Sequence, residues 1–469
     1  MASEMVVRST RHIPSDVLCE IFLHLSSPLR LLEPYKFPWY LGQVCSEWRA
    51  TFLSMQPYFW NEIQIERPED HNRQADSARI MAMLTFFLNV TNGGPFSFTL
   101  FKESEVPDVE LILSKLRDYS MQWVNASMEL RVSELLLLRS VKNRVPLLKS
   151  LELILPIRLE VEASNHDPTS LLQVGLLFEN APLLTRIKLT CLSDLGWRFN
   201  WAQLTSIHLC WFSDSPQLII TTLRQAINLE EFTLDGTKSG DTDWENIGDT
   251  AIIRLPRLKY LAIRASFFLT ILRTPALEEL MIEFKEENSD NARIMAEFLR
   301  KSKCELSRLS VRGVKLLVLA AILSHTPNLE KLLLWHEEFL VHLVKWLAGS
   351  EPGIDGRQEL PLRRLRSLSL NCWSDIEASD LEAVQNMVTH RNSTIDNSVE
   401  SLRELEIYTD LSWNGPPAVL KSLESLCKDK RIDFRFIRSF DPMDFKVIQL
   451  PISIQELASG NSKQKSRAA

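Results

Sequence analysis

A short motif recurs along the chain from residue 147 onward and restricts the folds that the chain can adopt. Its first, fourth and sixth positions are apolar, and ten copies occur. The first apolar residues of the copies stand at positions 148, 184, 204, 229, 258, 277, 306, 329, 365 and 402. The gaps run from 19 to 37 residues and average about 28, which is in the range of repeat proteins. Chance clusters of leucine would not be spread so evenly, so the sequence predicts a repeat array.

Segments with a helical pattern lie between the copies of the motif. These segments include residues 169–180, 216–228, 291–303 and 379–391. The last of them opens with Ser379 and Glu382 in the spacing of a capping box. Each unit is therefore predicted as a strand, a loop and a helix, with the helix covering the apolar face of the strand. More divergent strands are expected near Ile63, Phe98, Leu130 and residues 432–437.

The repeated unit resembles the leucine-rich repeat, which implies an α/β solenoid with parallel strands inside and helices outside. The standard repeat has Asn or Cys three positions after the third apolar residue. Here those positions hold Pro156, Leu192, Phe212, Thr237, Ser266, Lys285, Val314, Glu337, Trp373 and Asp410. The asparagine ladder of the family is absent, so the loops must satisfy their backbone groups in another way. The sequence therefore predicts an irregular solenoid.

The residues between the apolar positions of each strand are expected on the concave face of the solenoid. They are Arg186, Lys188, Ser206, His208, Glu231, Thr233, Tyr260, Arg264, Glu279, Glu283, Arg308, Arg312, Lys331, Trp335, Ser369, Asn371, Glu404 and Tyr408. A mixed, charged and extended row suits a protein partner better than a small molecule. Trp and Arg are over-represented among binding hot spots. The predicted target contacts are Trp211, Arg264, Trp335 and Trp373. Alternatively, each indole packs over the end of its own strand.

The first sixty residues carry two helical stripes. The first stripe consists of Ile13, Val17, Leu18, Ile21, Phe22 and Leu25. The second consists of Leu41, Val44, Cys45, Trp48 and Phe52. Both have the spacing of one side of a helix, and prolines at 28, 34 and 38 interrupt the chain between them. A unit of this size buries too little surface to cover all these groups itself, so an uncovered apolar patch would mark an interaction site.

This segment resembles an F-box, a short helical motif with the pattern Leu-Pro, Ile-Phe-x-x-Leu, Val-Cys-x-x-Trp-Arg and Leu-Trp. The matching residues are Pro14, Leu18, Ile21, Phe22, Leu25, Val44, Cys45, Trp48, Arg49 and Trp60. Ile13 and Phe59 replace leucines of the pattern, and the loop over residues 26–39 is longer and richer in proline than usual. The resemblance covers about fifty residues of the chain.

The resemblance implies docking on the adaptor subunit of an SCF-type cullin–RING ubiquitin ligase, and through it on a cullin. The adaptor-binding residues would be Ile13, Pro14, Val17, Leu18, Ile21, Phe22, Leu25, Leu41, Val44, Cys45, Trp48, Phe52 and Trp60. The repeats would hold a target protein, which makes the chain a non-catalytic substrate receptor in ubiquitination and protein degradation. The alternative is a leucine-rich-repeat interaction scaffold unconnected to ubiquitin, with the first helices as an N-terminal cap.

Composition and charge exclude several other classes of partner. The 469 residues are 45% hydrophobic and 24% charged, with a formal net charge of -7, which gives no basic surface for nucleic acid or an anionic membrane. The longest apolar run, residues 316–323, is far shorter than the roughly 20 residues that span a bilayer. With no signal-peptide core at the N-terminus, we expect a cytoplasmic or nuclear protein. Seven scattered cysteines fit reduced thiols.

The sequence carries no recognisable catalytic or metal-binding motif. His336 and His342 stand six residues apart, which is not a shared helical face, and residues 241–249 have Asn246 where a calcium loop needs glycine. Neither a phosphate-binding glycine cluster nor GxSxG occurs. We therefore expect no enzyme activity, no cofactor and no metal, and a hydrolase with dispersed residues is the third alternative.

The predicted organisation has three parts. Residues 8–61 form an all-helical F-box-like domain, and residues 62–440 form the solenoid of α/β class, whose first units are divergent. Residues 458–469 are polar and small, and we expect them to be a disordered tail.

Overall fold

The computed structural model describes nineteen stretches of the chain. They are residues 13–25, 28–31, 33–55, 61–65, 73–91, 93–100, 109–155, 168–190, 196–212, 216–237, 252–264, 266–284, 290–313, 316–336, 341–349, 362–372, 376–393, 399–409 and 417–438. The predicted tail at 458–469 lies outside the described residues. The chain divides into two compact units, Met1–Leu306 (unit 1) and Ser307–Ala469 (unit 2), and each contains a run of parallel strands.

Unit 1 begins with two helices, and three shorter elements lie between them in the sequence. In chain order, the helices and these elements are α1 (Ser15–Leu25), β1 (Leu29–Arg30), η1 (Pro34–Lys36), η2 (Trp39–Gln43) and α2 (Ser46–Ser54). Strand β1 pairs in parallel with β2 of the sheet, with Leu29 opposite Ile63. The prediction of an all-helical segment is therefore wrong, because pairing with β2 creates a two-residue strand that no local pattern indicates.

The main sheet of unit 1 is open and parallel, and its strands follow one another in the order β1-β2-β3-β4-β5-β6-β7-β8-β10-β12. The strands after β1 are β2 (Glu62–Ile65), β3 (Phe96–Leu100), β4 (Trp123–Glu129), β5 (Ser150–Ile154), β6 (Arg186–Thr190), β7 (Ser206–Phe212), β8 (Glu231–Thr237), β10 (Tyr260–Ile263) and β12 (Glu279–Glu283). A separate small sheet pairs β9 (Ile253–Arg254) with β11 (Leu272–Arg273).

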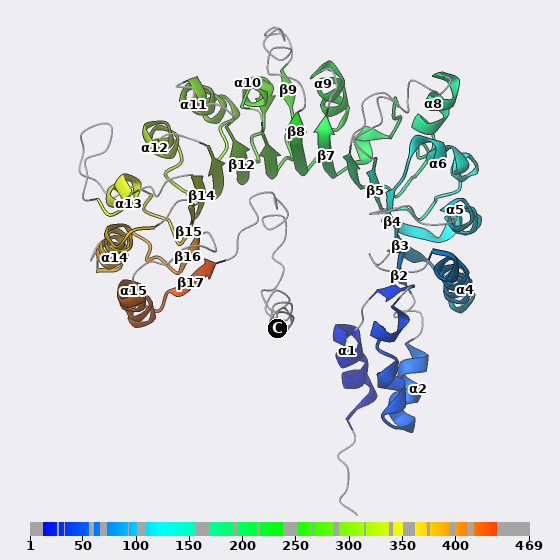
Figure 1. Ribbon diagram of the computed structural model, residues 1–469. Helices are drawn as coiled ribbons and strands as arrows, with labels where there is room; N and C mark the ends of the chain where they lie inside the picture. The colour runs from blue at the N-terminus through cyan, green and yellow to red at the C-terminus, as the bar shows by residue number, and fades with distance from the viewer. Residues whose placement is uncertain are drawn as a thin grey trace, which may run out of the picture. The chain divides into compact units, whose positions relative to one another are not determined.

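Helices cover one side of this sheet (Figure 1). They are α4 (Arg73–Val90), α5 (Val109–Asp118), α6 (Val132–Leu137), α8 (Pro168–Gly175), α9 (Pro216–Gln225), α10 (Phe268–Ile271) and α11 (Asp290–Ser302). The helix-facing residues of the strands are buried: Leu151 and Leu153 of β5 are both 0% exposed. The alternate residues of each strand form the other face of the sheet, which we call the polar face.

Unit 2 repeats the arrangement with five parallel strands in the order β13-β14-β15-β16-β17. The strands are β13 (Arg308–Arg312), β14 (Lys331–His336), β15 (Ser367–Cys372), β16 (Glu404–Thr409) and β17 (Asp433–Arg438). The helices are α12 (Leu316–Ser324), α13 (Val341–Leu347), α14 (Ala378–Ser393) and α15 (Pro417–Asp429). The α/β class with parallel strands is thus confirmed in both units.

The recurring motif predicts strand positions closely. In all ten copies the strand begins two residues after the first apolar position, as Ser150 follows Leu148 and Glu404 follows Leu402. Neighbouring strands stay in register, so that Leu153 of β5 lies opposite Leu189 of β6. The motif therefore marks where the chain enters the sheet, which is the property expected of a repeat array.

Two local predictions differ from the structure. Strand β4 ends at Glu129 and lies before Leu130 rather than around it. Helix α14 begins at Ala378, so Ser379 lies inside the helix and does not cap it. Asp380, the third residue of the helix, instead bonds back to the residue that precedes it: its Oδ2 accepts a hydrogen bond from the Glu377 backbone N–H at 2.8 Å.

Candidate functional site

The N-terminal helices have a small core of their own. Leu18 and Phe22 stand one turn apart on α1 and are 0% exposed, because residues four apart lie on the same face of a helix. The Phe22 ring meets the Trp48 ring of α2 edge to face, with centroids 5.2 Å apart. Such a contact adds about 0.5–1.5 kcal/mol to the burial itself, so α1 and α2 are held together as a pair.

Hydrogen bonds and one close approach fix α2 against η2. Cys45 caps α2, since its Sγ accepts a hydrogen bond from the Trp48 backbone N–H at 3.5 Å. Arg49 Nε donates to the Gly42 carbonyl oxygen at 2.9 Å. A Cβ at Gly42 would lie only 3.2 Å from the Phe52 ring, so glycine allows the two elements to approach this closely.

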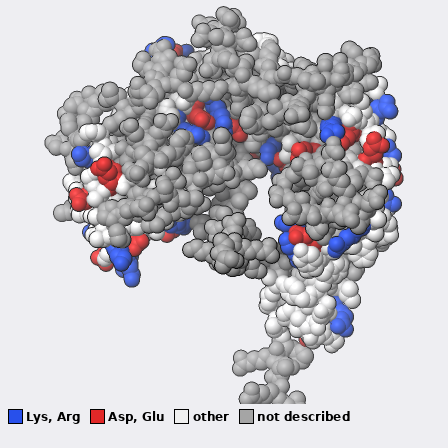
Figure 2. All heavy atoms as spheres, viewed as in Figure 1, with Lys and Arg blue, Asp and Glu red and all other residues white. Residues whose placement is uncertain are grey.

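Beside the buried face of α1 runs a row of exposed apolar side chains, which we call the apolar row. It consists of Ile13, Val17, Ile21 and Leu25, which are 39%, 43%, 37% and 43% exposed. Nine of the eighteen exposed large apolar side chains in the described residues lie between Ile13 and Leu53. The surface of α1 and α2 is mostly uncharged in Figure 2. Such a concentration of apolar surface is typical of an interaction site.

The predicted adaptor-binding residues divide between this surface and the core. The exposed members are Ile13, Pro14, Val17, Ile21, Leu25, Val44 and Cys45, and Trp48 is half-buried. The buried members are Leu18, Phe22, Leu41 and Phe52. These four side chains pack beneath that surface and support it, and their predicted contact with the adaptor stays a prediction. Trp60 lies outside the described residues.

The polar face of unit 1 carries charges that are paired across neighbouring strands. Ser127 of β4, Glu152 of β5 and Lys188 of β6 lie opposite one another in register. Ser127 Oγ donates to Glu152 Oε2 at 2.7 Å, and Lys188 Nζ lies 2.7 Å from Glu152 Oε1. Burial raises the pKa of Glu152, but the hydrogen bonds from Lys188 and Ser127 outweigh it and hold that pKa below its ordinary value. Acidic and basic atoms are interspersed in Figure 2.

Arg264, a predicted target contact, lies between two carboxylates of its own chain. Its Nε is 2.5 Å from Asp235 Oδ1 and 3.2 Å from Glu283 Oε2. Burial raises the pKa of Asp235, and Arg264 opposes that effect. A target that contacted Arg264 would therefore have to share or displace these carboxylates, and the predicted contact stays a prediction.

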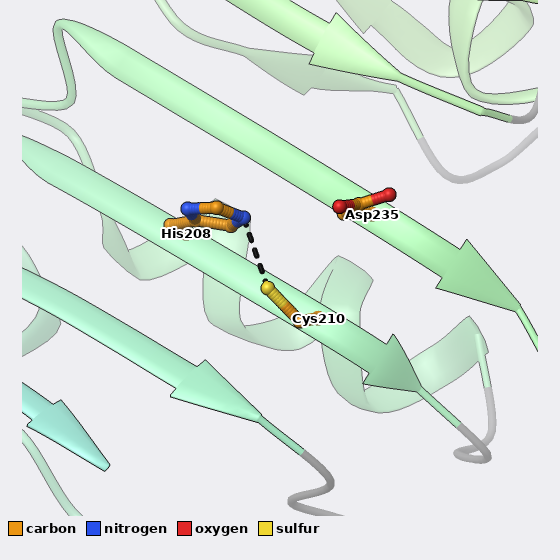
Figure 3. Close-up of side chains that lie close together, drawn as sticks. All are labelled: His208, Cys210 and Asp235. Carbon is orange, nitrogen blue, oxygen red and sulfur yellow. Dashed lines mark hydrogen bonds between the residues drawn. The ribbon is translucent and has the colours of Figure 1, made fainter. Parts of the chain in front are cut away.

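Three further side chains of the polar face gather at neighbouring strands, and we call them the β7–β8 cluster: His208, Cys210 and Asp235 (Figure 3). His208 Nε2 lies 2.9 Å from Cys210 Sγ, and Asp235 lies opposite Cys210 in the register of β7 and β8. Of these three residues, the strand pattern predicts only His208 on this face. The motif itself carried the missing signal, since the offset between positions 204 and 229 maps Cys210 onto Asp235.

A shallow hollow of ≈ 190 Å³ lies on the polar face over β2 to β5. Its polar lining residues are Glu62, Ser97, Thr99, Asn125, Ser127, Ser150 and Glu152. Asn125 Nδ2 donates to Ser97 Oγ at 2.8 Å, and burial raises the pKa of Glu62. The hollow thus presents mainly hydroxyl, amide and carboxylate groups to a partner.

The polar face of unit 2 is more enclosed than predicted. Ser369 and Asn371 of β15 lie on this face as predicted, but they are 0% and 2% exposed, so they offer almost no surface to a partner. Ser369 Oγ donates to Glu406 Oε2 at 2.8 Å, and Arg435 Nη1 lies 3.2 Å from Glu406 Oε1. Glu406 therefore joins β15, β16 and β17 across this face.

Of the three tryptophans predicted as target contacts, the structure describes the side chain of Trp335 alone. Trp335 lies on β14 and is half-buried. Trp211 belongs to β7, but its side chain lies outside the described part, as does the whole of Trp373. Their role in target binding stays a prediction.

Comparisons with known proteins assign no family to the chain. No family model matches it, and no curated protein matches it. Among the described helices, none combines the length and the apolar character needed to cross a membrane.

Proposed function

We propose that this chain is the substrate-recognition subunit of an SCF-type cullin–RING ubiquitin ligase. Residues 13–60 resemble an F-box and would dock on the adaptor of the ligase. The polar faces of the repeats would bind a target protein. The chain would supply no catalytic group: it would hold a target lysine beside the charged conjugating enzyme and so raise the effective concentration of that lysine.

The observation that carries the proposal is the apolar row, which begins at Ile13 and continues along α1. Its four side chains are about 40% exposed, so a partner that covered them would gain roughly 2–5 kcal/mol at 1.5–3 kcal/mol for each fully buried side chain. This gain is a substantial part of the free energy of a specific contact, and the row matches positions of the F-box pattern at Ile21 and Leu25.

The polar faces support a protein as the second partner. The hollow over β2 to β5 holds ≈ 190 Å³, whereas sites for small molecules usually enclose about 300–1,000 Å³. The charges beside it, such as Lys188 and Glu152, are held in place by their neighbours across the strands. A row of fixed, alternating charges suits recognition of an extended protein surface.

A charge placed on the apolar row tests adaptor docking. Ile21→Glu and Leu25→Glu should abolish co-purification with the adaptor, because a carboxylate would be buried in the contact without a partner. Both side chains are exposed, so thermal unfolding of the full chain should change little. Leu111→Glu on α5 is the matched control, since Leu111 is 56% exposed but lies outside the F-box-like segment. Undiminished co-purification of Ile21→Glu and Leu25→Glu would refute the proposal.

One observation favours the alternative of a repeat scaffold unconnected to ubiquitin. Strand β1, which lies between α1 and α2, is the first strand of the unit 1 sheet and pairs with β2. The N-terminal helices would then be a cap of the repeat array, as terminal units of repeat proteins often are. Under this alternative the wild-type chain would not capture the adaptor at all, while target capture would persist.

A further inference from the structure

The β7–β8 cluster has the donor atoms of a transition-metal site. His208 and Cys210 stand two residues apart on β7, so both side chains lie on the same face of the strand. One ligand atom of each of the three residues lies within 4.8 Å of the other two, and Figure 3 draws them on adjacent strands. We infer that His208, Cys210 and Asp235 bind a zinc ion through the imidazole, the thiolate and a carboxylate oxygen.

Zinc would require only small movements of these side chains. Tetrahedral zinc sites have Zn–S distances of about 2.3 Å and Zn–N or Zn–O distances of about 2.0–2.2 Å, which place the donor atoms roughly 3.3–3.6 Å apart. His208 Nε2 and Cys210 Sγ are 2.9 Å apart, so this pair would open by about 0.6 Å. The distance from the Asp235 oxygen to the other two donor atoms would shorten by up to about 1.4 Å. Rotation of the side chains, with the strands fixed, is enough for such shifts.

The chemistry of the donors favours zinc over hard cations. A thiolate and an imidazole select zinc and other late transition metals, whereas magnesium and calcium prefer sites made of oxygen atoms. A neutral imidazole binds zinc through the lone pair of one ring nitrogen. Zinc would displace the proton of the Cys210 thiol, so binding releases a proton.

The net charge of the groups around the cluster is also compatible with a divalent cation. Lys188 pairs with Glu152 at 2.7 Å, and Arg264 pairs with Asp235 and Glu283 at 2.5 and 3.2 Å. Three carboxylates thus face two cations. Adding Zn²⁺ and removing the thiol proton adds one positive charge and makes the group neutral. Arg264 holds Oδ1 of Asp235, and a carboxylate has a second oxygen for the metal.

Three protein ligands leave one coordination position for a further donor. Structural zinc sites use four protein ligands, whereas three ligands and an open position are typical of sites that bind water or an incoming group. The cluster lies on the polar face, beside the residues proposed to meet the target. A water molecule or a side chain of a bound protein would complete the site. The zinc site itself does not rest on the proposed function.

Metal titration of the full-length chain tests the inference. The protein is treated with a chelator, desalted and titrated with Zn²⁺ in the presence of a chromophoric competitor, which gives the affinity. The number of zinc ions bound per chain is measured by inductively coupled plasma mass spectrometry. We expect one tightly bound zinc per chain and no comparable binding of Mg²⁺. With Co²⁺ as the probe, we expect a thiolate-to-cobalt charge-transfer band and visible absorption typical of tetrahedral coordination.

Substitutions locate the site. Loss of a group that only supports a ligand typically weakens a metal about 10–100-fold, so Cys210→Ser and Asp235→Asn, which remove proposed ligands, should each weaken zinc by at least this much. Cys210→Ser should also remove the charge-transfer band, whereas Asp235→Asn should keep it. Cys304→Ser is the matched control, because Cys304 lies in unit 1 outside the cluster. Circular dichroism of each metal-free variant shows whether it is folded. Absence of stoichiometric zinc in the wild-type chain, or full affinity in folded Cys210→Ser, would overturn the inference.

Discussion

Phe22 and Ile21 are adjacent on α1 but face different surroundings, and alanine at each should have very different effects. Phe22 is 0% exposed and packs on Trp48, whereas Ile21 is 37% exposed. Truncating a buried phenylalanine to alanine costs about 3–5 kcal/mol. Truncating Ile21 should cost about 1 kcal/mol or less, since part of its surface already meets water and alanine favours the helix.

Hydrogen exchange followed by mass spectrometry measures this difference locally. If α1 and α2 open as one unit, Phe22→Ala should lower the protection of peptides from α1 and α2 by about 10²- to 10⁴-fold, because every 1.4 kcal/mol is a factor of ten. Ile21→Ala should lower that protection by less than about tenfold. Peptides from β15 and β16 of unit 2 serve as the internal reference, because the two substitutions lie in unit 1.

The comparison decides how losses of adaptor capture are interpreted. If Phe22→Ala abolishes capture, the cause is loss of the helical pair, whereas loss caused by Ile21→Glu would come from the surface itself. Equal loss of protection in Phe22→Ala and Ile21→Ala would refute the division of α1 into a buried face and the apolar row. A larger loss in Ile21→Ala would refute it as well.

Two further predictions concern buried polar groups. Arg391 is 2% exposed and donates to the carbonyl oxygens of Leu347 and Leu362 at 3.3 and 2.8 Å, so Arg391→Ala should lower the unfolding free energy of unit 2 by about 3 kcal/mol, measured by denaturant titration. An unchanged midpoint would contradict this role. Burial raises the pKa of Glu62, which makes its charged form costly at neutral pH. Stability is therefore lost as pH rises from the ordinary carboxyl pKa through the raised one. Glu62→Gln should raise the melting temperature at pH 7, and the gain should vanish near pH 4; the opposite trend would argue against a raised pKa.

Much of the fold follows from short-range pattern. The apolar motif locates ten strands because a strand that buries one face must alternate apolar and polar residues. Strand β1 could not be found in this way, since its two residues are a strand only through pairing with β2. Ser379 was a misleading signal, because Asp380 one position later makes the capping hydrogen bond.

The candidate sites were predictable to different degrees. A helical stripe does not distinguish Phe22, which packs on α2, from Ile21, which meets water, because the two positions are neighbours around the helix. The β7–β8 cluster depends on the register between two strands, and that register was already contained in the spacing of the motif. The ion pairs of Arg264 with Asp235 and Glu283 could not be predicted, because a strand pattern does not indicate which charged side chains are in contact.

The constant entry point of the strands has a consequence for how such a chain can change. Repeat lengths differ by up to 18 residues, yet every strand that follows a motif starts at the same offset. Length variation is therefore absorbed outside the strands. Each polar residue keeps its position in the strand register. An insertion in a connecting segment would therefore change the surface formed by the connections and leave the spacing of residues on the polar face unchanged.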